Sequence, residues 1–351
     1  MNQKERIIAL SNAFGPSGLE DEVVEIVKKD LPSSYEAKED TLRNLYLFPH
    51  QKKKEGYTIL LDAHSDEVGF IVQSILSNGT IRFLPLGGWD PVNVAGSAVE
   101  ILGEQGKVSG IVAAKPVHFM SEEEKKKPID LDSMRIDVGT SSKEETLSLG
   151  IDVGCFIVPA TKCLYNEQLE IFQGKAFDCR IGCAALLQTL HEIDQESFLG
   201  NAIGVLSAQE EVGDRGSECV ARTIRADVAI CFEGCPADDS FESPDCIQTA
   251  MKKGVMLRAY DRSMITHPGF QKFALNCAKE NNIPYQVAVR KGGGTNGGVY
   301  HLHNIPTIVL GIPTRFAHNG TCFCAYQDYR NAVDLAKAII QSLSPEILSS
   351  F

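Results

Sequence analysis

The middle of the chain has a different residue pattern from the segments on both sides of it, and this change constrains the fold most. Between Gly69 and about Val158, short β-branched runs alternate with glycine-rich turns, which is the pattern of a small all-β unit. The predicted strands of this unit are residues 70–75, 80–84, 98–101, 107–113 and 135–138, with a charged loop at 120–128. We interpret the unit as a domain inserted between two halves of another domain.

The flanking segments have the pattern of an α/β domain. Strands are expected at residues 57–62, 202–208, 227–232 and 307–311, and helices at 182–193, 217–225, 270–280 and 327–343. Ser17 and Glu20 have the spacing of a capping box, which predicts a further helix beginning there. The alternation favours a mostly parallel sheet sandwiched by helices. We therefore predict an α/β domain at 1–68 and 166–351, and an inserted β-barrel-like domain at 69–165.

Charge and cysteine content limit the class of partner and the compartment. The formal net charge of −12 argues against nucleic acid or an anionic membrane as the partner. No stretch approaches the roughly 20 apolar residues of a membrane helix. The chain has 11 cysteines, an odd number, and its first ten residues lack the apolar core of a signal peptide. Free thiols in the cytoplasm are the expectation.

Histidines and acids follow several predicted strands. His64 comes after the strand 57–62 with Asp66 two residues later, an arrangement that suits a metal ligand and its orienting carboxylate. Glu233 closes the strand 227–232, and His318 follows the strand 307–311 in a similar place. Each residue taken alone also fits a solvated turn.

Three more acids belong to the same pattern. Glu210 and Glu211 are adjacent after the strand 202–208, so one could bind a metal while the other faces the substrate as a general base. Asp178 precedes a predicted helix, where it would be either an N-cap or a carboxylate that bridges two metals.

Together these residues indicate a two-metal hydrolase. Strand ends of one α/β unit gather ligands at a common edge, and mixed nitrogen and oxygen ligands suit zinc, cobalt or manganese. A carboxylate that bridges two ions, each with its own histidine and acid, is the layout of such a site. The long gap between His64 and Asp178 fits if the β unit is inserted between them.

In five stretches the chain resembles the tetrahedral aminopeptidases, a family that includes glutamyl and deblocking aminopeptidases. The stretches are residues 61–69 (LDAHSDEVG), 174–182 (GKAFDCRIG), 209–213 (QEEVG), 292–295 (GGGT) and 312–315 (IPTR). Their order and spacing match over essentially the whole chain, and the combination is highly specific although no single stretch is.

The resemblance implies a role for each candidate residue. Two divalent ions, most simply zinc or cobalt, would be bound by His64 with Glu233 and by Glu211 with His318, with Asp178 bridging them. The general base would be Glu210, and Asp66 would orient His64. The substrates would be peptides with a free N-terminus. The family fold is that of co-catalytic zinc peptidases, and its inserted barrel mediates contacts in dimers that assemble into a tetrahedral dodecamer.

Three positions depart from the family pattern. Cys179 stands where a second Asp is usual, at a junction that resembles ones with a cis peptide bond. Asn296 replaces an Asp and removes a negative charge near the expected site, and Glu233 replaces an Asp but keeps a carboxylate. Cysteines near these segments are Cys179, Cys183, Cys231, Cys235, Cys322 and Cys324. They are interpreted as small buried hydrophobes, with thiolates that alter metal preference or oxidation sensitivity as the alternative.

Two other functions stay open at this point. A metal-stabilised scaffold with weak or no peptidase activity would explain the departures at Cys179 and Asn296. A glucanase would need two carboxylates across a sugar but neither His64 nor His318. Side-chain specificity also stays open, because five cations are candidates for a specificity pocket: Arg258, Arg262, Arg290, Lys291 and Arg315.

Overall fold

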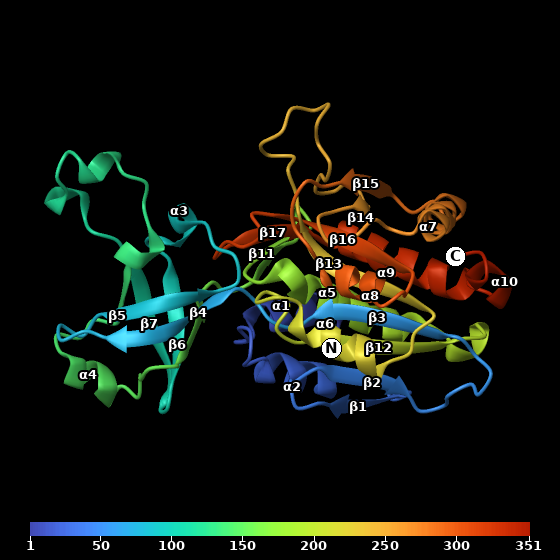
Figure 1. The fold of residues 1–351 in the computed structure, drawn as a ribbon, viewed down its shortest axis with the longest axis horizontal. Helices are drawn as coiled ribbons and strands as arrows, with labels where there is room; N and C mark the ends of the chain where they lie inside the picture. Colours follow the sequence, from blue (N-terminus) through green and yellow to red (C-terminus); the bar gives the residue numbers. More distant parts are fainter.

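The computed structural model describes residues 1–351, apart from the side chain of Gln195, and shows a large α/β body beside a small barrel (Figure 1). The strands are β1 (Tyr35–Glu39), β2 (Leu45–Pro49), β3 (Thr58–His64), β4 (Gly69–Ile75), β5 (Ile81–Leu86), β6 (Ala98–Gly103), β7 (Gly106–Ala113), β8 (Arg135–Asp137), β9 (Phe156–Pro159), β10 (Leu164–Asn166), β11 (Ile171–Gly174), β12 (Asn201–Ser207), β13 (Val228–Pro236), β14 (Val255–Tyr260), β15 (Tyr285–Val289), β16 (Thr307–Arg315) and β17 (Cys322–Ala325). The α-helices are α1 (Gln3–Asn12), α2 (Asp21–Lys29), α3 (Pro91–Val94), α4 (Lys143–Ser148), α5 (Phe177–Glu192), α6 (Arg215–Thr223), α7 (Pro268–Glu280), α8 (Asn296–Leu302), α9 (Tyr326–Ser342) and α10 (Pro345–Leu348). Short 3-10 turns are η1 (Val117–Phe119), η2 (Glu124–Lys126), η3 (Leu131–Ser133) and η4 (Gln195–Ser197).

The large body is built on an 11-stranded sheet. Its main order is β1-β2-β12-β3-β13-β16-β17-β11-β10, and β14 and β15 branch from β16. The central strands β12, β3, β13 and β16 are parallel, whereas the strands toward both edges pair antiparallel. The predicted α/β fold with a mostly parallel central sheet is therefore confirmed.

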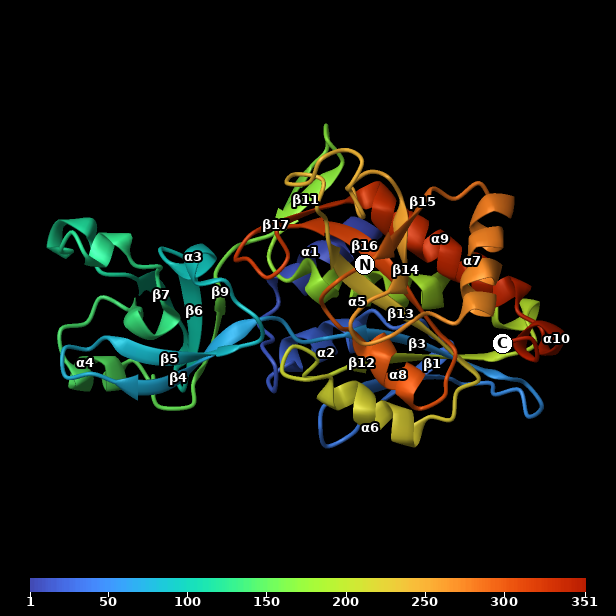
Figure 2. The same cartoon turned by 45° about the horizontal axis from the view of Figure 1, so that its top comes forward.

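Helices cover both faces of this sheet, which explains its continuous apolar strands. Along β3, Ile59, Leu61 and Ala63 face the core under α1, α5 and α9, while Leu60 faces the core under α6 and α8. Figure 2 shows α6 and α8 on one side of the central strands and α5 and α9 on the other. Because both faces are buried, the strand lacks the alternation of a half-exposed one.

The barrel closes in the order β4-β5-β8-β7-β6-β9, between Gly69 and Pro159. Its own core includes Phe70, Ile101 and Ile136, separate from the cores of the α/β body. The chain then returns to the large sheet at β10, which pairs with β11. A small antiparallel barrel joined to a mixed α/β body is therefore the observed architecture.

The predicted capping box at the start of α2 is wrong. The helix begins at Asp21, and the cap residue Glu20 makes no side-chain cap bond. Ser17 Oγ instead donates to Oδ2 of Asp66 at 2.6 Å, and Glu20 Oε1 accepts from the backbone amides of Gly18 and Gln209. The two side chains are used in tertiary contacts that sequence spacing does not reveal.

Among the described residues, no helix is both long enough and apolar enough to cross a membrane.

Candidate active site

Four of the candidate residues lie at the carboxyl ends of the central strands. His64 is the last residue of β3, Glu210 and Glu211 follow β12, and Glu233 lies within β13, which continues past the predicted end to Pro236. Because β12, β3 and β13 are parallel neighbours, these ends meet at one edge of the sheet.

Asp178 connects the two histidines. It lies in the first turn of α5, after the cap residue Ala176, and the Asp178–Cys179 peptide bond is cis. Its Oδ1 is 3.0 Å from Nε2 of His64, and its Oδ2 is 3.3 Å from Nε2 of His318. The backbone of Asp178 (φ −84°, ψ 104°) and of Cys179 (φ −115°, ψ 33°) is not helical, so the regular part of α5 begins after them. The carboxylate of Asp178 lies between the two histidines.

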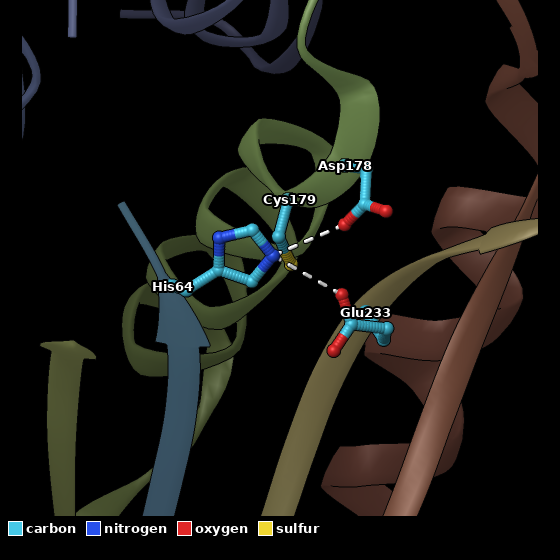
Figure 3. Close-up of side chains that lie close together, drawn as sticks. All are labelled: His64, Asp178, Cys179 and Glu233. Atoms are coloured by element: carbon cyan, nitrogen blue, oxygen red, sulfur yellow. Dashed lines mark hydrogen bonds and ion pairs between the residues drawn. The ribbon is translucent and has the colours of Figure 1, made fainter. Parts of the chain in front are cut away.

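A further carboxylate completes each of two groups of donor atoms. Glu233 Oε1 lies 3.3 Å from Nε2 of His64, and Glu211 Oε2 lies 3.5 Å from Nε2 of His318. Figure 3 shows the His64 and Glu233 donor atoms converging with Asp178. Ligand bonds of about 2.0–2.2 Å in tetrahedral geometry put neighbouring ligand atoms about 3.3–3.6 Å apart. The observed spacings are close to this, so both groups fit a divalent ion, with Asp178 shared.

The imidazole of His318 is held by the barrel side of the molecule. His318 lies in a turn after β16 with a positive φ of 60°. Its Nδ1 is 2.8 Å from the main-chain oxygen of Gly88, between β5 and α3. A metal-binding histidine commonly donates its second ring N–H to such an acceptor, which fixes the tautomer that leaves Nε2 free.

Asp66 organises the other side of the cluster. Its Oδ1 accepts from the backbone N–H of Glu210 at 3.0 Å and lies 3.3 Å from Nδ1 of His64. Its Oδ2 accepts from the backbone N–H of Glu211 at 3.2 Å and from Ser17. One buried carboxylate thus positions a histidine and both adjacent glutamates.

The cluster buries several carboxyl groups close together, and this shifts their pKa values. Burial raises the pKa of Glu211 to about 8 and that of Glu233 to about 7, and the charge of Asp178 adds to both shifts. Burial also raises the pKa of Glu210 well above its ordinary value. Burial opposes ionisation of Asp178 too, but hydrogen bonds from His318 and His64 keep its pKa well below the usual range.

This electrostatic pattern also fits cation binding. Four carboxylates face two imidazoles, so the positive charge available from side chains is small. Oε1 of Glu211 is buried and has no hydrogen-bond partner among the described residues. Divalent ions would supply the missing charge and allow all four acids to ionise.

A buried ion cluster lies behind the site and joins α5 to the end of β3. Lys175 Nζ lies 2.5 and 2.6 Å from the two oxygens of Glu67, and Arg180 Nη2 lies 3.3 Å from Oε1. Arg180 also donates to the main-chain oxygens of Ser65 and Gly15. All three charged side chains are at most 2% exposed. The cluster fixes the chain just after His64 and on both sides of Asp178.

The site opens into a cavity of about 690 Å³. The donor side is lined by Asp178, Glu210, Glu211, Glu233 and His318. The lining also includes residues 289–295 and the cations Arg258, Arg290 and Lys291. Of the other two cations considered from the sequence, Arg315 is paired with Asp239, and Arg262 does not belong to the cavity lining.

Asn296 does not itself line the cavity, although its neighbour Thr295 does. It is buried behind β3, where its Nδ2 donates to Oδ2 of Asp62 at 2.8 Å and to Oγ of Ser207 at 2.7 Å. Sequence reasoning also missed Gly88 and Asp214, which both line the cavity. Gly88 was hidden because it belongs to the inserted unit, and Asp214 because its left-handed backbone (φ 53°) leaves no periodic signal.

The fold is that of the co-catalytic zinc peptidases. Its marks are a parallel central sheet with helices on both faces, an attached antiparallel barrel and a histidine–carboxylate cluster at the strand ends. The sequence pattern of the M42 glutamyl aminopeptidases matches residues 44–335. The glutamyl aminopeptidase of Lactococcus lactis is 28% identical over 97% of each chain. The chain belongs to the M42 family of aminopeptidases.

Solved structures agree with this assignment. A TET aminopeptidase from the marine sediment archaeon Thaumarchaeota archaeon SCGC AB-539-E09 superposes with a TM-score of 0.95 at 35% identity, covering 99% of each chain. The TET1 peptidase of Pyrococcus horikoshii, which can assemble into a tetrahedron or a large octahedral shell, superposes with a TM-score of 0.87 at 26% identity. That match covers 97% of this chain and all of the other. The resemblance to tetrahedral aminopeptidases and the predicted fold are confirmed.

Proposed function

We propose that this protein is a two-metal aminopeptidase that removes residues from the free N-terminus of peptides. The observation that carries the proposal is the placement of Asp178, whose two oxygens lie 3.0 and 3.3 Å from two different histidines. Each histidine has its own glutamate, Glu233 or Glu211, within 3.5 Å. Such a shared carboxylate is what a pair of adjacent ions requires.

The metal ligands we propose are His64, Glu233 and Asp178 for one ion, and His318, Glu211 and Asp178 for the other. Zinc or cobalt suits this mixed donor set. When bound, two such ions acidify a water molecule and polarise the scissile carbonyl. Nδ1 of His64 faces Oδ1 of Asp66 at 3.3 Å and Nδ1 of His318 faces the main-chain oxygen of Gly88 at 2.8 Å, so both Nε2 atoms would be left for the ions.

Glu210 is the proposed general base. Its Oε2 lies 3.9 Å from Nε2 of His64, at the edge of the donor groups, and its side chain lines the cavity. It accepts a proton from the attacking water and returns it to the leaving amine. Return of the proton to the amine needs a carboxyl group that holds a proton before it donates. Burial raises the pKa of Glu210 and so favours this protonated form.

The acidic side of the cavity suits recognition of a free α-amine. Glu210, Glu211 and Glu233 together present carboxylates to the cavity, whereas the cations Arg258 and Arg290 in the same lining bind Asp261 and Thr249. A protonated amine is attracted to the first group, and a blocked N-terminus is not. This concentration of carboxylates is the basis for proposing removal of terminal residues.

Release of free amino acid from unblocked and N-acetylated peptides tests the function. The protein is stripped of metal with a chelator and then reloaded with zinc or cobalt. We expect no cleavage after chelation, recovery on reloading, and cleavage of the unblocked peptides only; a panel of N-terminal residues ranks side chains in the same assay. No cleavage despite two bound ions would instead favour a scaffold. Hydrolysis of a glucan that survives chelation would favour a glycosidase.

Substitution of Asp66 by asparagine tests its positioning role. The amide keeps one acceptor but turns a donor toward a backbone N–H of Glu210 or Glu211. We expect metal affinity and activity to fall about 10–100-fold, as for other outer partners of metal ligands. The control is Ser17→Ala, which removes only the hydroxyl that donates to Asp66 and should have a smaller effect. Asp66→Asn with unchanged metal affinity and rate would contradict the role.

We also propose a homo-oligomer of dimers, assembled through the barrel and reaching a tetrahedral dodecamer. The superposition on a TET1 peptidase that can form a tetrahedron supports this assembly.

All 11 cysteines are free thiols, which supports a reducing compartment, and we propose the cytoplasm.

A further inference from the structure

A thiol lies beside the donor atoms of His64, Asp178 and Glu233. Cys179 follows Asp178 in the chain, and its side chain is fully buried. One ligand atom from each of His64, Asp178, Cys179 and Glu233 lies within 4.8 Å of the other three. Figure 3 shows the Cys179 side chain reaching toward Nε2 of His64, the same nitrogen that the carboxylate oxygens of Asp178 and Glu233 face.

We propose that Cys179 is a further ligand of the ion held by His64 and Glu233, binding through Sγ as a thiolate. The inference rests on the metal centre of the proposed function. Sγ now donates to the main-chain oxygen of Phe232 at 3.2 Å. On binding, the thiol proton passes to water, this hydrogen bond is lost and a sulfur–metal bond replaces it.

The sulfur makes the two ion sites chemically different. The other group, Asp178 with Glu211 and His318, contains only nitrogen and oxygen donors among the residues that the structure describes. Thiolates favour softer ions such as zinc, while carboxylate-rich sites accept harder ions such as manganese. The site with Cys179 is therefore selective for zinc or cobalt, and the site with His318 is more permissive.

The neighbouring Cys183 provides a matched control. It lies one helical turn further along α5 and is also fully buried. Its Sγ donates to the main-chain oxygen of His64 at 3.0 Å and does not belong to the donor groups. A spectroscopic signal of sulfur coordination should depend on Cys179 and not on Cys183.

Cobalt absorption in the full-length protein tests the proposal. Cobalt(II) bound by a thiolate has a ligand-to-metal charge-transfer band in the near ultraviolet, which nitrogen and oxygen ligands alone do not produce. We expect this band in the wild-type protein loaded with two cobalt ions, its loss in Cys179→Ser, and its retention in Cys183→Ser. Bound cobalt without the band, or a band lost only in Cys183→Ser, would overturn the proposal.

A second measurement avoids substitutions altogether. X-ray absorption of the zinc-loaded wild-type protein should show a zinc–sulfur shell at about 2.3 Å, contributed by one of the two ions. Two bound zinc ions with a shell of only nitrogen and oxygen would refute sulfur coordination but leave the aminopeptidase proposal intact. A protein that binds no metal would instead refute the metal centre itself, so the two failures are distinguishable.

Discussion

Replacement of Glu210 by glutamine is expected to lower kcat by about 10²–10⁴-fold, the usual contribution of general acid–base catalysis. The amide keeps the size of the side chain but cannot accept the proton from water. Since the proposed ligands are unchanged, the variant should still bind two ions per chain. The measurements are the release of amino acid at saturating peptide and the metal content of the purified protein.

A surface glutamate supplies the control for this experiment. Glu218 is exposed and pairs with Arg222 and His303, outside the cavity. Glu218→Gln should therefore retain the wild-type rate. Near-normal turnover in Glu210→Gln would remove Glu210 from the role of base, and loss of metal in that variant would make it a ligand instead.

Replacement of Glu67 by glutamine is expected to lower the free energy of unfolding by about 3–5 kcal/mol, because it leaves Lys175 and Arg180 buried without their anion. Chemical denaturation of the metal-free protein measures this directly, since bound metal would add its own stabilisation. The control is Glu124→Gln, which removes an exposed ion pair with Lys115 and should change stability little.

The effect of Glu67→Gln should also depend on pH. Burial lowers the pKa of Lys175 from 10.5 to about 8 in the folded protein. The unfolded chain thus binds more protons between pH 8 and 10.5, so wild-type stability rises with pH across this window. Without Glu67 the folded-state pKa falls further, and the rise begins at lower pH. The loss caused by the substitution should therefore shrink toward pH 10.5; a loss that is constant with pH would contradict the electrostatic origin.

Residues at the ends of parallel strands were the most predictable part of the site. His64 ends and Glu211 follows a buried apolar strand, and Glu233 lies toward the carboxyl end of another, so parallel pairing brings the three to one edge. The presence of a small antiparallel barrel was also predictable, because its short strands and turns contrast with the α/β pattern of the flanking segments.

Contacts between segments distant in sequence were not predictable from local pattern. Nothing in the spacing shows that Asp66 accepts from the backbone of Glu210 and Glu211, since those amides come from another strand end. Ser17 and Glu20 matched a local motif, but in the structure Ser17 donates to Asp66 and Glu20 accepts from the backbone N–H of Gln209. Asn296 lies behind the sheet because α8 packs there, which the flanking glycines do not indicate.

The hydrogen bond between His318 and the main chain of Gly88 limits how the barrel can be exchanged for that of another protein. The acceptor belongs to the barrel side and the imidazole to the α/β body, so the orientation of one proposed ligand depends on both units. The approach is also close, because a Cβ on the preceding Gly87 would lie 3.1 Å from Oε2 of Glu211. The barrel is thus not a freely exchangeable module. A chimera that takes its barrel from a relative must keep a glycine at position 87, where φ is +84°, and must place a main-chain oxygen where that of Gly88 lies.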